Sequence, residues 1–167
     1  MTSLATVRPA VAADGDALGK LGALLVAEHH DFDPKRFIAP VPDLAVRYGR
    51  FLVGQSQRPD MRVLVAERDC EIVGYGFVGM EGNDYMALRG PAGVIYDLVV
   101  HPDHRRQGIG SLLLAAALDA LARLGAPRAL LFTADKNHVA QALFDKGGFR
   151  RTMIEMTLEL DAGSPTD

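Results

Sequence analysis

The chain has 167 residues, of which 49% are hydrophobic and 23% are charged, as in an ordinary soluble globular domain. The formal net charge of −3 argues against a general nucleic-acid-binding protein, and no apolar run is long enough to span a membrane. A single cysteine, Cys70, excludes an internal disulfide and suits a reducing compartment. Residues 1–9 lack the features of a secretory signal, so we expect a cytoplasmic protein.

In chain order, the first expected elements are a short strand and two helices. Alternation over residues 4–9 predicts a strand, which the proline at its end stops. Asp14 is expected to cap a helix over residues 15–28, and Asp43 is expected to cap a second one over residues 44–52.

The middle of the chain reads as three strands. Residues 62–67 and 72–79 predict an antiparallel hairpin, because both runs are apolar and a polar turn separates them. Residues 80–93 are rich in glycine and predict a loop. Residues 94–100 form an almost continuous apolar run, which is typical of a central strand buried on both faces. Asp97 stands out in that run.

The last part of the chain alternates helices with strands. A helix is expected over residues 111–124, a strand parallel to the central one over 128–133, and a short helix over 137–146. Residues 149–160 predict a closing strand, and residues 161–167 are expected to be disordered. We therefore predict a single mixed α/β domain over residues 1–160.

A basic, glycine-bearing loop joins the central strand to the helix that follows. The first N–H groups of a helix have no partner inside it and lie at the positive end of its dipole, so the amides from Gly108 to Ser111 can hold a phosphate. Glycine allows an anion to approach the main chain, and Arg105 and Arg106 add charged donors. The loop is thus a candidate anion site.

Two motifs connect this loop to a known family. Residues 100–110 read VHPDHRRQGIG and match the pattern Arg/Gln-x-x-Gly-x-Gly/Ala, while residues 137–149 read NHVAQALFDKGGF and are similar to Asn-x-x-Ala-x-x-Leu-Tyr-x-x-x-Gly-Phe. Together they resemble the GNAT superfamily of acyl-CoA-dependent N-acetyltransferases. The resemblance implies the GNAT fold, in which two central parallel strands splay apart and coenzyme A enters the gap between them.

The resemblance also implies a cofactor site. The loop would hold the pyrophosphate of acetyl-CoA, and main-chain groups at the end of the central strand would pair with the pantetheine arm as an added strand would. The implied cofactor-binding residues are Leu98, Val99, Val100, Arg105, Arg106, Gln107, Gly108, Ile109, Gly110, Ser111, Asn137 and Phe144. No histidine and cysteine cluster has zinc spacing, so no metal is expected.

The implied reaction is direct transfer of an acetyl group to a primary amine of a small molecule or peptide. Asp97 is the first candidate for the base, because burial could raise its pKa; the rival roles are binding a cationic acceptor or accepting local hydrogen bonds. The main-chain N–H of Val99 could donate to the reacting oxygen. Tyr96 has the opposite strand parity, so at most one of Tyr96 and Asp97 is expected to face the cofactor cleft.

No sequence motif of the family identifies the residues that line the acceptor pocket. Alternative catalytic or acceptor-binding groups lie at the end of the first helix and after it: Glu28, His29, His30 and Asp31. The closing strand often helps to make dimers in the family, so a homodimer is one state that the resemblance allows. No nucleic-acid or membrane partner is expected.

The chain departs from the family at Phe144, where a tyrosine usually supplies a proton to the leaving thiolate. A coenzyme A thiolate can take its proton from water, so the substitution does not abolish transfer in principle. Two function classes stay open: an N-acetyltransferase, and a module that binds or senses acyl-CoA with little transferase activity.

Overall fold

One mixed sheet organises the protein, whose structure, a computed structural model, describes residues 4–160. Its five strands follow one another in the order of the chain: β1 (Thr6–Pro9), β2 (Met61–Arg68), β3 (Glu71–Glu81), β4 (Ala92–Val100) and β5 (Ala129–Leu131). The first four pair antiparallel, and β5 pairs parallel with β4. The predicted hairpin, the central strand and the parallel pair are confirmed.

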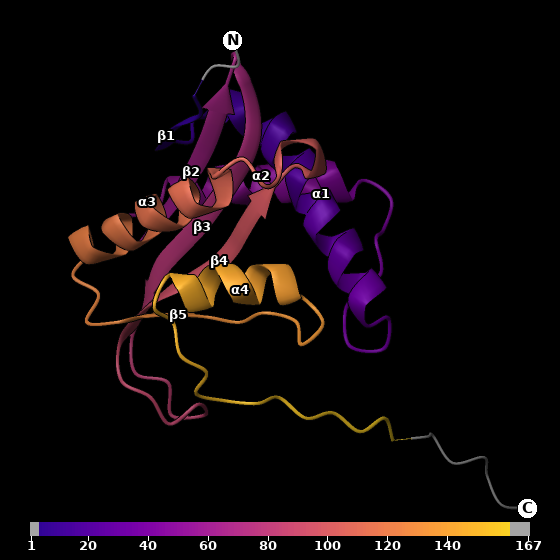
Figure 1. Ribbon diagram of the computed structural model, residues 1–167, viewed down its shortest axis with the longest axis vertical. Helices are drawn as coiled ribbons and strands as arrows, with labels where there is room; N and C mark the ends of the chain where they lie inside the picture. Colours follow the sequence, from indigo (N-terminus) through magenta and orange to yellow (C-terminus); the bar gives the residue numbers. More distant parts are fainter. Residues whose placement is uncertain (1–3, 161–167) are drawn as a thin grey trace, which may run out of the picture.

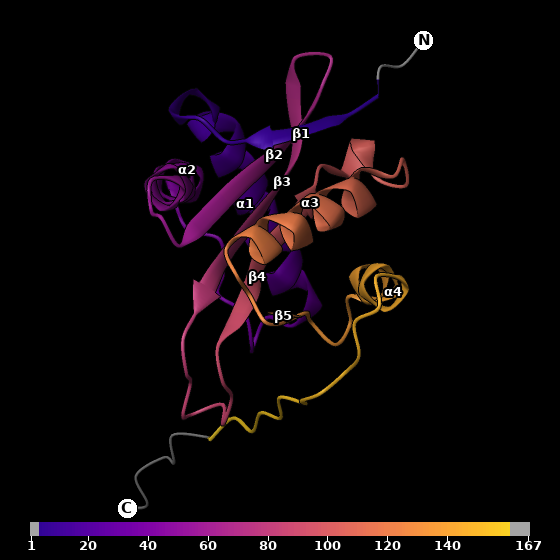
Figure 2. The ribbon, with the colours of Figure 1, turned by 90° about the vertical axis from the view of Figure 1, so that its left-hand side faces the viewer.

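Four α-helices cover the two faces of the sheet: α1 (Gly15–Phe32), α2 (Leu44–Ser56), α3 (Ile109–Arg123) and α4 (His138–Lys146). Figures 1 and 2 show α1 and α2 on one face, and α3 and α4 on the other. Leu18 and Leu52 belong to the core cluster of the first face, whereas Leu114 and Leu121 belong to that of the second. Within residues 4–160, no helix combines length with enough apolar character to cross a lipid bilayer.

The predicted helix caps are right in position and wrong in contact: Asp14 and Asp43 are the N-cap residues of α1 and α2. Neither Asp14 nor Asp43 makes a side-chain cap, and Asp43 has a left-handed backbone with φ 60°. The Asp14 carboxylate instead accepts hydrogen bonds from the Arg8 guanidinium at 2.8 and 3.0 Å and from the N–H of Val11 at 2.8 Å, which ties β1 to the start of α1. The Arg8 hydrogen bond holds the pKa of Asp14 below its usual range, against the opposing effect of burial.

Glycines bring α1 and α2 into unusually close contact. A Cβ atom added to Gly19 would lie 2.0 Å from the carbonyl oxygen of Ala45, and one added to Gly49 would lie 2.2 Å from that of Gly15. A Cβ atom at Gly22 would lie 2.2 Å from the ring of Tyr48. From the sequence, glycines within a helix only suggest a weak helix. Here they let two helix backbones touch, and they set the position of Tyr48.

The predicted closing strand is also wrong. After α4 the chain is extended and exposed, and residues 150–160 form no strand (Figure 1). The alternating pattern is present, but a strand also needs a neighbour for its hydrogen bonds. Described side-chain contacts tie the segment down at only two residues: Arg151 donates to Gln141 at 2.8 Å, and Glu155 forms an ion pair with Arg36. The predicted disorder of residues 161–167 lies outside the described residues.

The close α1–α2 contact predicts opposite effects for two glycine substitutions. Gly19→Ala should destabilise the protein by about 1–3 kcal/mol, because its methyl group would overlap a main-chain carbonyl of α2. Gly54→Ala, near the end of α2, meets nothing within 4 Å and should stabilise the helix by about 0.5–1 kcal/mol. Urea unfolding of the two variants and the parent measures the difference. Equal midpoints for the two variants would contradict the close packing.

Candidate active site

A bulge in β4 shapes the centre of the molecule. The register with β3 runs from Val100 opposite Gly74 to Asp97 opposite Phe77, and then jumps to Ile95 opposite Val78. Tyr96 is therefore an extra residue in β4 that has no partner residue in β3, as in a β-bulge. The bulge cancels the alternation, so Tyr96 and Asp97 both turn to the face covered by α1 and α2. The opposite strand parity expected for these two residues is therefore wrong.

Asp97 is held by two hydroxyl groups from distant parts of the chain. Its Oδ2 atom accepts hydrogen bonds from Tyr48 of α2 and Tyr75 of β3, both at 2.8 Å. Within the described residues, Oδ1 has no hydrogen-bond partner and is free to bind or take a proton. Burial raises the pKa of Asp97, and the two hydroxyls oppose this shift without cancelling it. A raised pKa suits a carboxylate that exchanges a proton near neutrality.

Both tyrosines stay protonated and act as donors. Burial is the main reason why the pKa values of Tyr48 and Tyr75 are raised, and the negative charge of Asp97 adds to it. Neither tyrosine was expected at the site from the sequence. Tyr75 follows the hairpin pattern and Tyr48 lies on a helix, so neither carries a local signal. Only the β3–β4 register and the α1–α2 packing bring them to Asp97.

The end of β4 leaves main-chain groups open on the side of β5. The parallel pairing covers only Gly93 to Ile95, opposite Ala129 to Leu131. The two strands separate beyond that point, as the resemblance implied.

The β3 register decides which groups of β4 face the open side. The N–H of His101 donates to the carbonyl of Val73 at 2.8 Å, so alternation turns the main chain of Val99 toward β3 as well. The N–H groups of Leu98 and Val100 face the open edge. This arrangement corrects the expectation for Val99, whose N–H points away from the gap.

The loop after β4 presents free amides. α3 begins at Ile109, two residues earlier than predicted, and Gly108 before it has φ 82°, which favours glycine. The first hydrogen bond into the helix runs from the N–H of Leu112 to the carbonyl of Gly108. Within the described residues, the N–H groups of Ile109, Gly110 and Ser111 have no acceptor. They form the anion-binding end of a helix.

The polar side chains of the loop have different tasks. Arg105 donates through Nε to the carbonyl of Val100 at 2.9 Å and forms an ion pair with Glu28 of α1. Gln107 is held by Arg68 and donates to the carbonyl of Asp103 at 3.2 Å. Arg106 is exposed and makes no described side-chain contact, so it is the loop cation that is available for an anion.

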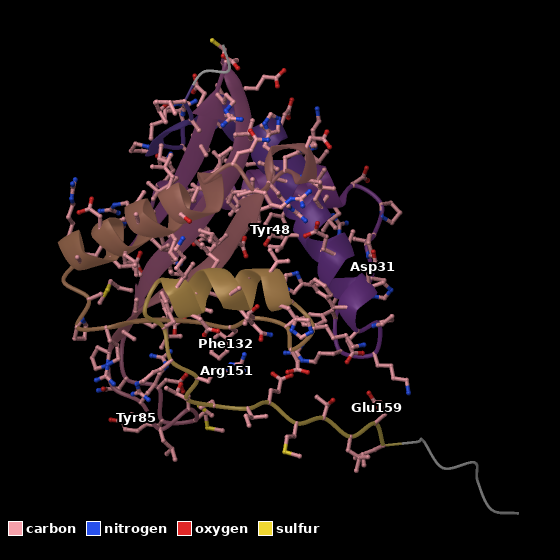
Figure 3. All side chains as sticks on the ribbon, viewed as in Figure 1. Asp31, Tyr48, Tyr85, Phe132, Arg151 and Glu159 are labelled. Atoms are coloured by element: carbon pink, nitrogen blue, oxygen red, sulfur yellow. The ribbon has the colours of Figure 1, made fainter. Side chains whose placement is uncertain are left out.

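The candidate acceptor residues lie in the last turns of α1. Glu28 is paired with Arg105. His29 places Nδ1 2.8 Å from the carbonyl of Leu25, and His30 places Nδ1 3.1 Å from that of Phe37. Because a carbonyl only accepts, each Nδ1 carries the proton and each Nε2 keeps its lone pair in the neutral ring. Asp31 is exposed on the outer side of α1 (Figure 3).

The second motif, residues 137–149, contributes a helix cap and side chains of the core. Asn137 caps α4, since its Oδ1 accepts from the N–H of Ala140 at 3.1 Å. Phe144 is buried in the core cluster between the sheet, α3 and α4, and it packs edge-on against Phe149. Its ring is therefore part of the core, and no side chain of α4 there supplies a hydroxyl.

Two further observations limit the site. Within residues 4–160, no three His, Cys, Asp or Glu side chains gather in a way that could hold a metal ion. A hollow of about 790 Å³ lies between the first half of α1 and the start of β3, where Lys20, Ile72 and His101 contribute to its walls. It includes neither Asp97 nor the loop amides, so it is separate from the candidate site.

Comparison with known proteins agrees with this geometry. The sequence profile described as "Acetyltransferase (GNAT) family" matches residues 25–149. A mycothiol acetyltransferase of Clavibacter michiganensis is 31% identical over 98 residues, which are 59% of this chain and 29% of that protein. A glucosamine 6-phosphate N-acetyltransferase of Schizosaccharomyces pombe is 32% identical over 72 residues, 43% of this chain and 62% of that protein. The chain thus spans less than a third of the mycothiol acetyltransferase.

Solved structures share the whole fold. A mutant of the BH1408 protein from Bacillus halodurans superposes with a TM-score of 0.77 at 22% identity, over 93% of this chain and 99% of that one. The aminoglycoside N-acetyltransferase AAC(6')-Iy in complex with CoA gives a TM-score of 0.70 at 15% identity, over 97% of each chain. The splayed strands, the loop of free amides and the matched profile lead to one conclusion: the chain belongs to the acetyltransferase (GNAT) family.

Proposed function

We propose that the protein transfers an acetyl group from acetyl-CoA to a primary amine of a small molecule or peptide. The observation that supports this best is Asp97, a carboxylate anchored on one oxygen, free on the other, and raised in pKa beside the open edge of β4. A module that only binds acyl-CoA would have no use for such a group. Amine-dependent release of coenzyme A thiol, measured against a panel of primary amines, tests the proposal.

The residues present fit acetyl-CoA. The N–H groups of Leu98 and Val100 suit the amides of a pantetheine arm, and the amides at the start of α3 suit a pyrophosphate. When bound, the co-substrate supplies an activated acetyl thioester.

Asp97 handles the proton of the acceptor. An amine is mostly protonated at neutral pH, and only its free base can attack, so a nearby base is needed. Oδ1 takes the proton, while Tyr48 and Tyr75 hold Oδ2 and keep the carboxylate in place. The N–H group of Leu98, which lies farther along β4 from the loop amides, is the donor for the acyl oxygen, and that of Val100 then serves the pantetheine arm. With Phe144 in the core, water provides the proton for the leaving thiolate.

The names of the similar proteins favour a small-molecule acceptor over a peptide. The relatives are named for mycothiol, glucosamine 6-phosphate and aminoglycosides, all of them small polar molecules. In this chain the acceptor side is formed by His29 and the rings of Phe32 and Phe37 around it, with Tyr48 and Asp97 beyond. The surroundings combine aromatic rings with one carboxylate, so we favour a small cationic amine.

Replacing the Asp97 carboxylate by an amide tests its role in the reaction without removing its hydrogen bonds in the fold. Asp97→Asn should lower the amine-dependent rate by about 100-fold or more, since general base catalysis typically contributes about 10²–10⁴-fold. The fold should survive, because an amide oxygen can accept the same two hydroxyls. His29→Gln is the matched variant for the neighbouring candidate. A loss confined to His29→Gln would assign the proton to His29 and contradict the role of Asp97.

The pH dependence of stability tests the raised pKa directly. An acid with a higher pKa in the folded protein holds its proton more tightly when folded, so its contribution to stability falls as pH rises from the unfolded value of about 3.9 through the folded one. Asparagine does not titrate. The stability of Asp97→Asn relative to the parent should therefore increase with pH across that window, as measured by urea unfolding at several pH values. A constant difference would show that the pKa is not raised.

Phosphate binding at the loop is tested by calorimetry with coenzyme A. Gly108→Glu should abolish binding, since it strains a left-handed position and places a negative charge beside the free amides. Gly125→Glu, at φ 83° after α3, is a control with the same backbone strain away from the loop. If both variants fold and both bind coenzyme A like the parent, the loop is not the phosphate site.

The two loop arginines should behave differently. Arg106→Ala should weaken coenzyme A binding in a salt-sensitive way, because its free guanidinium is the available cation. Arg105→Ala should instead loosen the end of β4, because Arg105 holds the carbonyl of Val100. Dephospho-CoA separates the possible contacts: an equal loss for both ligands assigns Arg106 to the pyrophosphate, and a loss for coenzyme A alone assigns it to the 3′-phosphate. Unchanged binding in Arg106→Ala would contradict the assignment.

A further inference from the structure

A buried hydroxyl beside the gap between β4 and β5 has no hydrogen-bond partner. Within the described residues, two buried side-chain atoms are unpaired: Nε of Arg68 and Oγ1 of Thr133. Arg68 still donates through another nitrogen to Gln107, whereas the hydroxyl of Thr133 is the only polar group of its side chain. Buried hydroxyls are nearly always paired, because an unpaired one costs free energy. The Thr133 hydroxyl is therefore a candidate contact for a ligand.

The sheet register places Thr133 opposite the reacting part of β4. Ile95 lies opposite Leu131 in the parallel pair, and Thr133 follows Leu131 by two residues. On β4, the second position after Ile95 is Leu98, because Tyr96 is the extra residue of the bulge. Thr133 is thus level with Leu98 across the gap. The N–H of Leu98 is the proposed donor for the acyl oxygen, so a thioester bound there would lie at the level of Thr133.

α4 fixes the stretch of chain that carries Thr133. The side-chain amide of Gln141 donates to the carbonyls of Ala134 at 2.9 Å and Asp135 at 2.7 Å. Figure 1 shows α4 running alongside this stretch after β5. The position of Thr133 is therefore set by α4 as well as by β5.

The direction of the Thr133 side chain follows from alternation. Leu131 packs in the same core cluster as Phe144 of α4, and Phe132 after it is exposed. Thr133 is then expected on the same side as Leu131, and its hydroxyl is buried as this requires. The hydroxyl thus lies on the side of the gap that α4 covers, where Phe144 has no hydroxyl of its own.

We propose that the Thr133 hydroxyl donates a hydrogen bond to the sulfur of coenzyme A as the acetyl group leaves. This inference rests on the proposed transfer from acetyl-CoA and adds to it a residue that touches the leaving group. The carbon–sulfur bond of the thioester breaks, and its electron pair stays on the sulfur. No bond to Oγ1 forms or breaks, and the hydroxyl keeps its proton. Water then protonates the thiolate.

The hydrogen bond favours the reaction because it strengthens as the sulfur becomes charged. A hydrogen bond to an ionised acceptor is about twice as strong as one to a neutral acceptor. The hydroxyl therefore stabilises the departing thiolate more than the bound thioester, and such a difference lowers the barrier. Thr133 in this way supplies, from the end of β5, the donor that Phe144 cannot supply from α4.

The ionisation of bound coenzyme A tests this contact without turnover. Thr133→Val keeps the shape of the side chain and removes the hydroxyl. In this variant the pKa of the bound thiol, followed by the ultraviolet absorbance of the thiolate, should rise by about 1, because a hydrogen bond that favours the charged form is lost. Thr133→Ser keeps the hydroxyl and should keep the pKa of the parent complex. Thr157→Val makes the same change at an exposed residue and should leave this pKa unchanged.

Urea unfolding of the free protein distinguishes this role from a structural one. Thr133→Val should raise the unfolding midpoint, because it removes an unpaired buried hydroxyl. A hydroxyl that served only the fold would have the opposite effect. In a single turnover with saturating acetyl-CoA and amine, Thr133→Val should transfer the acetyl group about tenfold more slowly than the parent.

The outcomes separate this inference from the proposed function. If the parent protein binds coenzyme A and transfers acetyl groups, while the bound thiol ionises at the same pH in Thr133→Val, the contact with sulfur is overturned and the proposed function stands. A lower unfolding midpoint for Thr133→Val would assign the hydroxyl to the fold and also overturn the contact. A parent protein that does not bind coenzyme A would overturn both.

Discussion

Two tyrosine hydroxyls on a single carboxylate oxygen connect the three parts of the chain that make the site. Tyr48 comes from α2, Tyr75 from β3 and Asp97 from the bulge of β4. Each depends on a packing feature elsewhere: Tyr48 on the glycines that bring α1 close to α2, and Asp97 on the extra residue that turns it to that face. The burial of the carboxylate and the raised pKa follow from this convergence.

The same bulge determines which groups β4 presents on its two sides. Toward α1 and α2 it presents Asp97, and toward the gap beside β5 it presents the N–H groups of Leu98 and Val100. A regular strand would put Asp97 in a different relation to these donors. The proposed base and the proposed cofactor edge thus belong to one strand. Arg105 extends this arrangement to α1, since it contacts both the carbonyl of Val100 and Glu28.

The sequence was informative where local patterns decide the structure. The apolar run of β4, the hairpin and the glycine loop before α3 were recognised because strand alternation and free helix amides are local properties. Val99, Tyr96 and the pair Tyr48 and Tyr75 could not be placed, since a bulge and a helix contact between distant segments set their directions. Residues 149–160 show the opposite case: the pattern of a strand is present, but pairing depends on a neighbour that the pattern does not specify.

The short contact between β4 and β5 has a thermodynamic consequence. Only three residues of each strand pair with the other, so beyond Ile95 the main chain of β4 has no strand partner on that side within the described residues. A ligand that fills this gap with its own amides replaces the hydrogen bonds that a longer β5 would have made. Binding of such a ligand therefore stabilises the folded state. At a concentration one hundred times its dissociation constant, the ligand adds about 2.7 kcal/mol to the free energy of unfolding.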